Sequence, residues 1–310
     1  MNDALFPGVV RIEPAGACNL ACRHCPTGTV DLARGIMSEA TFDRVLSQLR
    51  EAVDRIRVVV LYHGGEPLLN KRLPHMIAAL KAIGIPRIKT VSNGMMLDGQ
   101  WAADLAASSL DEIEFSLDGQ SLAENDLVRR RSSGTVVLAH VKDLLGRLGT
   151  MRSALKVSIA STQFVGLDDP LPPGPAPDPL WVRGALGSLA EQVNFKSTWA
   201  LVWPHMQVDE SLFVQRPAKQ AAPLLLCDHV ENTLTVRWDG TVVACCYDLT
   251  NKLIIGNGLT DRLDNIWHGK PRQAIRDSIS SGGCPAACVR CAAIRPPTYL
   301  SWRAGAIGAG

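Results

Sequence analysis

The sequence predicts an α/β fold built on a parallel β-sheet, together with a smaller C-terminal part. From residue 9 to about residue 204, short apolar runs alternate with helix-like segments, which is the pattern of βα units whose strands lie parallel. Six such units can be counted, fewer than the eight of a complete barrel, so the sheet is either open or partly closed. After residue 205 the pattern changes to a hairpin and short segments. We therefore expect two domains, at residues 1–204 and 205–310.

The elements of the first domain can be assigned in order. Strands are expected where β-branched and apolar residues cluster, at residues 9–14, 57–62, 88–92, 112–117, 155–160 and 195–202. Helices are expected at residues 39–53, 71–83, 101–108, 136–148 and 181–193. Ser38 is a suitable N-cap for the first of these helices, and Gly84 a suitable stop for the second. In the second domain, Asp239-Gly240 is expected to form the turn of a β-hairpin.

Composition and charge argue against several classes of function. The 310 residues carry a net charge of +2 and no long basic run, which disfavours a dedicated nucleic-acid-binding protein. No signal-peptide pattern opens the chain and no apolar stretch is long enough to cross a bilayer. We therefore expect a cytoplasmic protein with no membrane partner. Nine cysteines in such a protein indicate metal or redox chemistry rather than disulfides.

The first cysteine group, Cys18, Cys22 and Cys25, comes shortly after the first predicted strand. Thiolates are the ligands that iron–sulfur clusters select. Three local thiolates would hold three irons of a four-iron cluster and leave the fourth iron open to a small molecule. A structural zinc site closes with four ligands, and no fourth thiol lies nearby in the sequence. The spacing therefore favours an iron–sulfur cluster.

Four loops with glycine or polar residues follow predicted strands, at residues 62–67, 92–94, 116–119 and 160–162. The carboxyl ends of parallel strands meet at one edge of the sheet, where ligands bind. Glycine lets the backbone approach a ligand closely, and polar neighbours can hold an amine, a carboxylate or a ribose. The candidate binding residues in these loops are Gly64, Gly65, Glu66, Ser92, Asn93 and Ser116.

The three-cysteine loop followed by Gly64-Gly65-Glu66-Pro67 resembles the radical S-adenosylmethionine (radical SAM) superfamily, over residues 9–202. The resemblance implies a partial (β/α)6 TIM-type barrel. It also implies a [4Fe–4S] cluster on the three cysteines, with SAM bound to the open iron. Family members cleave SAM to a 5′-deoxyadenosyl radical, which removes a hydrogen atom from the substrate.

The same resemblance gives roles to the loop residues. Gly64, Gly65 and Glu66 match the motif that contacts the amino group of SAM. Ser92, Asn93 and Ser116 match positions that hold its carboxylate or ribose.

The C-terminal pattern resembles the twitch/SPASM extension of many radical SAM enzymes, over residues 227–292. The resemblance implies a small β-hairpin and helix domain with one auxiliary [4Fe–4S] cluster, held by Cys227, Cys245, Cys288 and Cys291. Six thiols are too few for two fully ligated clusters, which need about eight. A zinc site is the alternative, because four thiolates also suit zinc. The role of Cys284 stays open.

Cys246 directly follows Cys245, so within a strand its side chain would point to the opposite side. If that side faces the barrel, Cys246 is a catalytic residue that returns a hydrogen atom to a substrate radical; the alternative is a small buried thiol. The pattern is similar to that of neomycin C epimerase and of aminocyclitol dehydrogenase, both of aminoglycoside biosynthesis. The cysteine pair favours the epimerase, an isomerase that inverts a carbon of a neomycin-type aminoglycoside.

Two other outcomes are compatible with the same motifs. A dehydrogenase would oxidise an alcohol of an aminocyclitol, and a maturase would modify a ribosomal peptide. For the two aminoglycoside enzymes the expected partners are a small-molecule aminoglycoside or aminocyclitol substrate and an external electron donor such as flavodoxin or ferredoxin.

Overall fold

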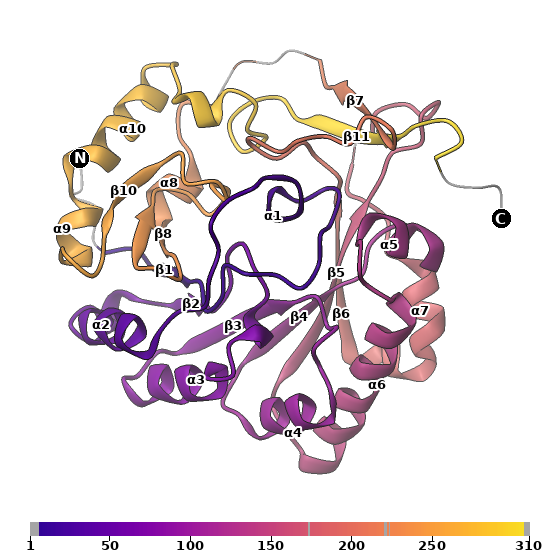
Figure 1. Ribbon diagram of the computed structural model, residues 1–310, viewed down its shortest axis with the longest axis horizontal. Helices are drawn as coiled ribbons and strands as arrows, with labels where there is room; N and C mark the ends of the chain where they lie inside the picture. Colours follow the sequence, from indigo (N-terminus) through magenta and orange to yellow (C-terminus); the bar gives the residue numbers. More distant parts are fainter. Residues whose placement is uncertain (1–5, 173, 220–221, 223, 307–310) are drawn as a thin grey trace.

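The computed structural model is organised around one nine-stranded sheet that curves about a central loop (Figure 1). The structure describes residues 6–172, 174–219, 222 and 224–306. The strands of the large sheet follow the order β10-β9-β8-β1-β2-β3-β4-β5-β6. Its first six members in sequence pair in parallel, each with the next strand along the chain. They are β1 (Val9–Ile12), β2 (Val58–Val60), β3 (Arg87–Ser92), β4 (Glu112–Ser116), β5 (Lys156–Gln163) and β6 (Val193–Trp199).

These six strands confirm the predicted α/β fold. Val10, Val59, Ile88 and Ile113 are fully buried, as expected for a parallel sheet whose two faces are both covered. A partial barrel of six parallel strands leaves the carboxyl ends of the strands around a common opening.

Helices cover the outer face of this sheet, while the loop that carries the short helix α1 (Pro26–Thr29) lies at its centre (Figure 1). The long helices begin where the sequence predicts, and the Oγ atom of Ser38 accepts a hydrogen bond from the N–H of Thr41. The helices of this part of the chain are α2 (Glu39–Arg50), α3 (Leu73–Ala82), α4 (Gly99–Ala107), α5 (Leu122–Val128), α6 (Gly134–Met151) and α7 (Leu180–Leu186). Short 3-10 helices lie at Val53–Arg55 and Pro67–Leu69.

The single helix predicted for residues 181–193 is wrong. Helix α7 ends at Leu186, and a 3-10 helix follows at Gly187–Gln192. Gly187 has φ +59°, a left-handed conformation that ends an α-helix.

The C-terminal part extends the barrel sheet instead of standing apart from it. Strand β8 (Thr233–Val236) pairs in parallel with β1 and antiparallel with β9 (Thr241–Val243). Gly240 takes φ +84° in the turn between them, which confirms the predicted hairpin. Strand β10 (Ile254–Asn257) closes this edge. The helices of this part are α8 (Asp228–Asn232), α9 (Leu263–Trp267), α10 (Lys270–Ser280) and the 3-10 helix Ala286–Cys288.

A second sheet of two antiparallel strands lies beside the barrel, formed by β7 (Phe213–Pro217) and β11 (Thr298–Trp302). It packs against the end of β5 through Phe164, whose ring lies 5.3 Å from Phe213 and 4.7 Å from Trp302. Both sheets therefore join the two parts of the chain, and the boundary at residues 204 and 205 stays a prediction. Within the described ranges, every helix is too short or too polar to cross a membrane.

Candidate functional site

A cavity of about 340 Å³ opens at the carboxyl ends of the barrel strands. It brings together ten of the fourteen residues predicted from the sequence, which lie on five separate stretches of the chain. These are Cys18, Cys22, Cys25, Gly64, Gly65, Glu66, Ser92, Asn93, Ser116 and Cys246. The other four, Cys227, Cys245, Cys288 and Cys291, lie outside its lining.

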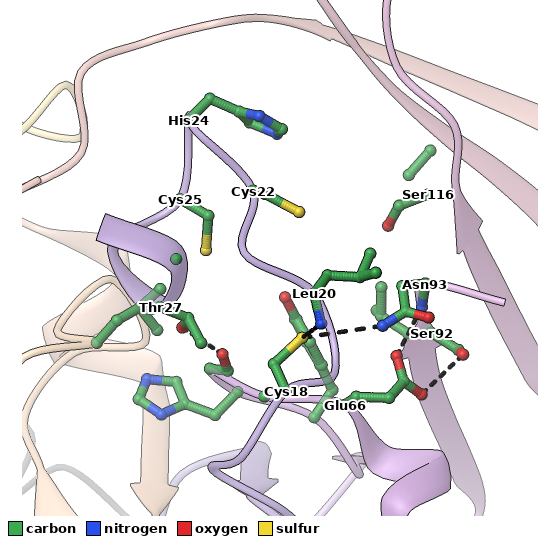
Figure 2. A pocket seen from close by; sticks show the side chains of 18 of the residues that line it. Cys18, Leu20, Cys22, His24, Cys25, Thr27, Glu66, Ser92, Asn93 and Ser116 are labelled. Atoms are coloured by element: carbon green, nitrogen blue, oxygen red, sulfur yellow. Dashed lines mark hydrogen bonds between the residues drawn. The ribbon is translucent and has the colours of Figure 1, made fainter. Parts of the chain in front are cut away.

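The three thiols of the first group point into one space (Figure 2). All nine cysteines lie in the described part of the chain, and none forms a disulfide. The Sγ atom of Cys18 accepts contacts from the N–H of Leu20 at 3.5 Å and from Nδ2 of Asn93 at 3.8 Å. Burial raises the pKa of Cys18, and that of Cys22 to about 12. Three thiols that share one space are the soft donors that iron–sulfur clusters select, so this donor set fits a resident iron–sulfur cluster.

The carboxylate of Glu66 is hydrogen-bonded to the loop that follows β3. Its Oε1 accepts hydrogen bonds from the N–H of Leu68 at 3.0 Å and from Oγ of Ser92 at 2.8 Å. Its Oε2 accepts the N–H of Asn93 at 2.7 Å (Figure 2). Burial raises the pKa of Glu66, while these three bonds act in the opposite direction. The carboxylate therefore holds two predicted binding loops in one geometry.

Gly65 lets the loop after β2 contact the loop after β1. A Cβ atom at Gly65 would lie 2.2 Å from the carbonyl oxygen of Ala15 and 2.4 Å from that of Ala17. The next N–H, of Glu66, donates to the same Ala17 oxygen at 2.8 Å. Only glycine fits at this crossing. A Cβ at Gly64 would meet side chains alone, the nearest atom being Oε1 of Glu13 at 3.1 Å.

Glu13 was not singled out from the sequence, and it joins the two parts of the molecule. Its Oε1 accepts the N–H of Gly64 at 3.0 Å, and its Oε2 lies 3.3 Å from Nε of Arg237 in the hairpin. The Nδ1 atom of His63 lies 3.3 Å from Oε1. Burial alone would raise the pKa of Glu13, but His63 and Arg237 lower it to about 2. The available signal was an acidic residue directly after a strand that is mostly apolar.

A buried ion pair supplies a fixed cation to the cavity, and the sequence analysis missed it. Nη1 of Arg129 lies 2.7 Å from Oδ2 of Asp118, and Nε2 of His24 lies 3.2 Å from the same oxygen. Burial would raise the pKa of Asp118, but the charge of Arg129 and the contact with His24 hold it well below its usual range. Both charged residues line the cavity beside Ser116.

The second cysteine group gathers at a separate small pocket, lined by Cys245, Cys288 and Cys291. Burial, and then the charges of Cys291 and Cys227, raise the pKa of Cys288 to about 12. The charge of Cys284 also raises the pKa of Cys288 and of Cys291, but by less. Among the described residues, no three His, Cys, Asp or Glu side chains are arranged to hold a single metal ion. Cysteine thiolates are the ligands that iron–sulfur clusters select, so this group of thiols fits an auxiliary cluster.

Cys246 lines the barrel cavity, while its neighbour Cys245 lines the small pocket. The two cysteines therefore face different sides, as expected, but the expectation that they lie in a strand is wrong, because β9 ends at Val243 and both follow it in a loop. The Sγ atom of Cys246 lies 3.5 Å from Nδ1 of His229 on α8. His229 lies close to Cys227 in the sequence, so two distant segments meet at this thiol.

Comparison with protein families matches two parts of the chain. The family model described as the radical SAM superfamily matches residues 12–149. A second model, described as an iron–sulfur cluster-binding domain and named SPASM, matches residues 227–292. The chain carries a radical SAM domain and a SPASM domain. Such domains bind SAM and [4Fe–4S] clusters, one of which is auxiliary, and the buried cysteines of both groups fit them.

Two kinds of curated protein are similar in sequence. Mycofactocin maturase MftC of Mycobacterium ulcerans is 25% identical over 291 residues, covering 86% of this chain and 76% of the relative. GTP 3′,8-cyclase of Parasynechococcus marenigrum is 30% identical over 155 residues, covering 47% of this chain and 44% of the relative. The second match therefore includes only part of each protein.

Two solved structures share the fold. BtrN, crystallised with AdoMet and 2-DOIA, superposes with a TM-score of 0.56 at 17% identity, over 89% of this chain and 88% of BtrN. SuiB of Streptococcus suis, crystallised with its precursor peptide SuiA, gives 0.58 at 14% identity, over 89% of this chain and 67% of SuiB. These likenesses confirm the radical SAM and SPASM fold over most of the chain.

Proposed function

We propose that this radical SAM protein is an epimerase that inverts a carbon of an amino sugar in an aminoglycoside, with Cys246 as the donor of the returning hydrogen atom. The observation that carries the proposal is the position of one thiol. Cys246 lines the cavity of the first cysteine group, although its neighbour Cys245 belongs to the second. A thiol in that position has no part in holding the first cluster, which already has three local cysteines.

The proposed ligands follow from the two groups of buried thiols. Cys18, Cys22 and Cys25 hold the cluster that binds SAM, and the auxiliary cluster takes Cys227, Cys245, Cys288 and Cys291. The SAM-binding residues are Gly64, Gly65, Glu66, Ser92, Asn93 and Ser116. Arg129 is proposed to add a cation for the SAM carboxylate, since it is buried at the cavity wall and fixed by Asp118.

The reaction divides between the cofactor and the chain. SAM and the reduced cluster supply the radical that removes a hydrogen atom from the substrate carbon. Cys246 then gives a hydrogen atom to the opposite face of that carbon: its S–H bond breaks as the new C–H bond forms. The sulfur radical left behind returns to a thiol by taking up one electron and one proton. The electron comes from a protein donor of the ferredoxin or flavodoxin class.

The state of Cys246 depends on its neighbour. The adjacent Cys245 thiol lowers the pKa of Cys246 from its ordinary value, against the effect of burial and with help from His229. A Cys245 thiolate that ligates iron has no S–H to donate and adds a negative charge. Both changes favour the protonated thiol of Cys246, which is the form that carries a hydrogen atom.

A dehydrogenase acting on an aminocyclitol is the second candidate. The likeness in fold to BtrN, which was crystallised with AdoMet and 2-DOIA, supports this candidate. The proximity of Cys246 to the auxiliary cysteines also suits electron transfer away from a substrate radical. The likeness to MftC and SuiB supports a peptide substrate instead.

Product mass separates these candidates. The loaded enzyme is incubated with neomycin C and SAM in D2O under a chemical reductant. The epimerase gives a product one mass unit heavier, with deuterium at the inverted carbon. A product lighter by two mass units would support the dehydrogenase, and an unchanged substrate would contradict both aminoglycoside candidates.

A further inference from the structure

A second cavity adjoins the first at the end of β6, and we call it the annex. It measures about 200 Å³ and shares His24, Thr162, Trp203 and Tyr247 with the barrel cavity. Tyr247 directly follows Cys246 in the chain. A ligand that reaches Cys246 in the barrel cavity therefore lies at the entrance of the annex.

The barrel cavity alone leaves little room for a large substrate. Its volume of about 340 Å³ must also receive SAM, which the cluster loop and the glycine loop border. Binding sites for molecules of this size measure about 300–1,000 Å³. A substrate with more than one ring must extend beyond the barrel cavity, and the annex is the space that continues from it.

Aromatic rings form the rigid walls of the annex. The rings of Trp203 and Tyr247 lie 4.5 Å apart between centroids, at 51° to one another. On its other side, Tyr247 packs against His229 at 4.6 Å. Nε1 of Trp199 donates to the carbonyl oxygen of Gly174, at 2.8 Å. These contacts hold the rings in place before any ligand arrives.

The chemistry of the lining suits a sugar or cyclitol ring. None of the described residues that line the annex is Asp, Glu, Lys or Arg, and the polar side chains are two threonines and His24, with Tyr247 and the two tryptophans adding polar edges. A sugar ring has apolar C–H faces that pack on aromatic rings and hydroxyl groups at its edge that hydrogen-bond to threonine. An ammonium group on such a ring is attracted to the face of tryptophan.

An extended peptide is a poorer match to this wall. The N–H of Val202 donates to the carbonyl oxygen of Thr298 at 2.8 Å, and the carbonyl oxygen of Ala200 accepts the N–H of Leu300 at 2.8 Å. The backbone groups of this stretch are therefore already paired with β11. A peptide that binds by adding a strand needs such groups unpaired.

We infer that the annex binds a second ring of the amino-sugar substrate and that Trp203 determines specificity for multi-ring substrates. The inference rests on the proposed function, because it takes an aminoglycoside as the substrate. Trp203 lies at the junction of the two cavities, so removal of its ring affects a ligand that spans both more than a ligand confined to one.

The test measures binding without turnover, by calorimetry on the enzyme loaded with clusters and SAM but without reductant. The two probes are 2-deoxystreptamine, which has one ring, and neomycin C, which has four. We expect Trp203→Ala to weaken neomycin C at least fivefold and 2-deoxystreptamine less than twofold. Trp203→Phe, which keeps an aromatic face, should restore most of the affinity. Trp101→Phe on α4 is the matched control and should change neither.

Equal effects of Trp203→Ala on both probes, no effect on either, or no binding of neomycin C to the wild type would overturn the inference. The isotope experiment reports separately on the proposed function. Binding through Trp203 without inversion would leave the annex standing and remove the epimerase. Inversion by the wild type, together with unchanged binding of neomycin C to Trp203→Ala, would support the epimerase and overturn the role of the annex.

Discussion

Cys246 and His229 meet at the wall of the barrel cavity, with Sγ of the cysteine 3.5 Å from Nδ1 of the histidine. The contact joins the turn after β9 to helix α8, and Tyr247 packs on the same imidazole. His229 is thus a positioning residue, which holds the thiol towards the cavity.

Replacement of His229 should loosen the coupling between SAM cleavage and product formation. In His229→Ala the thiol loses its partner, so we expect the ratio of inverted product to 5′-deoxyadenosine to fall about threefold or more, by loss of a hydrogen bond of about 1 kcal/mol. Chromatography of both products in one reaction gives this ratio. His229→Gln keeps a polar partner and serves as the control. An unchanged ratio in His229→Ala would show that the contact has no positioning role.

Gly65→Ala should damage SAM binding far more than Gly64→Ala. The new Cβ would lie 2.2 Å from a backbone oxygen at position 65, but 3.1 Å from a side-chain oxygen at position 64. Backbone cannot move aside cheaply, so the two loops must separate in the first variant. Equilibrium binding of SAM to the loaded enzyme should weaken at least tenfold in Gly65→Ala and only a few-fold in Gly64→Ala. Similar losses in both would contradict the crossing of loops described above.

Glu13→Gln should remove a stabilisation that depends on pH. The pKa of Glu13 is lowered to about 2 from its usual 4.5, by His63 and Arg237 against the effect of burial. A carboxyl with a depressed pKa stabilises the fold above its unfolded pKa, and this contribution is lost as the pH falls from about 4.5 towards 2. The shift corresponds to about 3 kcal/mol at neutral pH. Urea unfolding of the cluster-free protein measures the free energy of unfolding at pH 7 and pH 3.5. The difference in this free energy between wild type and variant should be smaller at pH 3.5. A difference in the free energy of unfolding that does not change with pH would show that the lowered pKa of Glu13 is not its cause.

Replacement of Cys288 should remove the auxiliary cluster and leave the other intact. The reconstituted wild type is expected to hold about eight irons. Cys288→Ala should retain about four, and it should still cleave SAM under a chemical reductant, because Cys18, Cys22 and Cys25 lie at a separate cavity. Cys284→Ala is the matched control and should keep all eight. Zinc in the wild-type protein would contradict the auxiliary cluster.

Local patterns in the sequence predicted most of the barrel and the SAM-binding loops. Alternation of apolar runs with amphipathic segments is enough to place six βα units, and strand ends then assemble Gly64, Ser92 and Ser116 at one opening. The continuation of the sheet through β8 was not predictable in this way. Its pairing with β1 joins residues more than two hundred positions apart, and no local pattern records such a contact.

The missed residues share a physical cause. Glu13 pairs with Arg237, more than two hundred positions away in the chain, and Arg129 pairs with Asp118, eleven positions away. Each pair is visible only when the fold buries both charges together. Cys246 was expected to point away from Cys245 because both were assigned to a strand. The two cysteines do line different cavities, but they lie in the loop after β9 and not in a strand. The annex was not anticipated, because it forms where the loop after β6 meets the turn after β9.

The central claim is that Cys246 returns the hydrogen atom, and Cys246→Ala tests it most directly. The loaded variant is incubated with neomycin C, SAM and a chemical reductant, and 5′-deoxyadenosine and inverted product are measured together. We predict that 5′-deoxyadenosine still forms at a rate within a few-fold of the wild type, while inverted product falls at least a hundredfold. Inversion at the wild-type rate in this variant would contradict the claim.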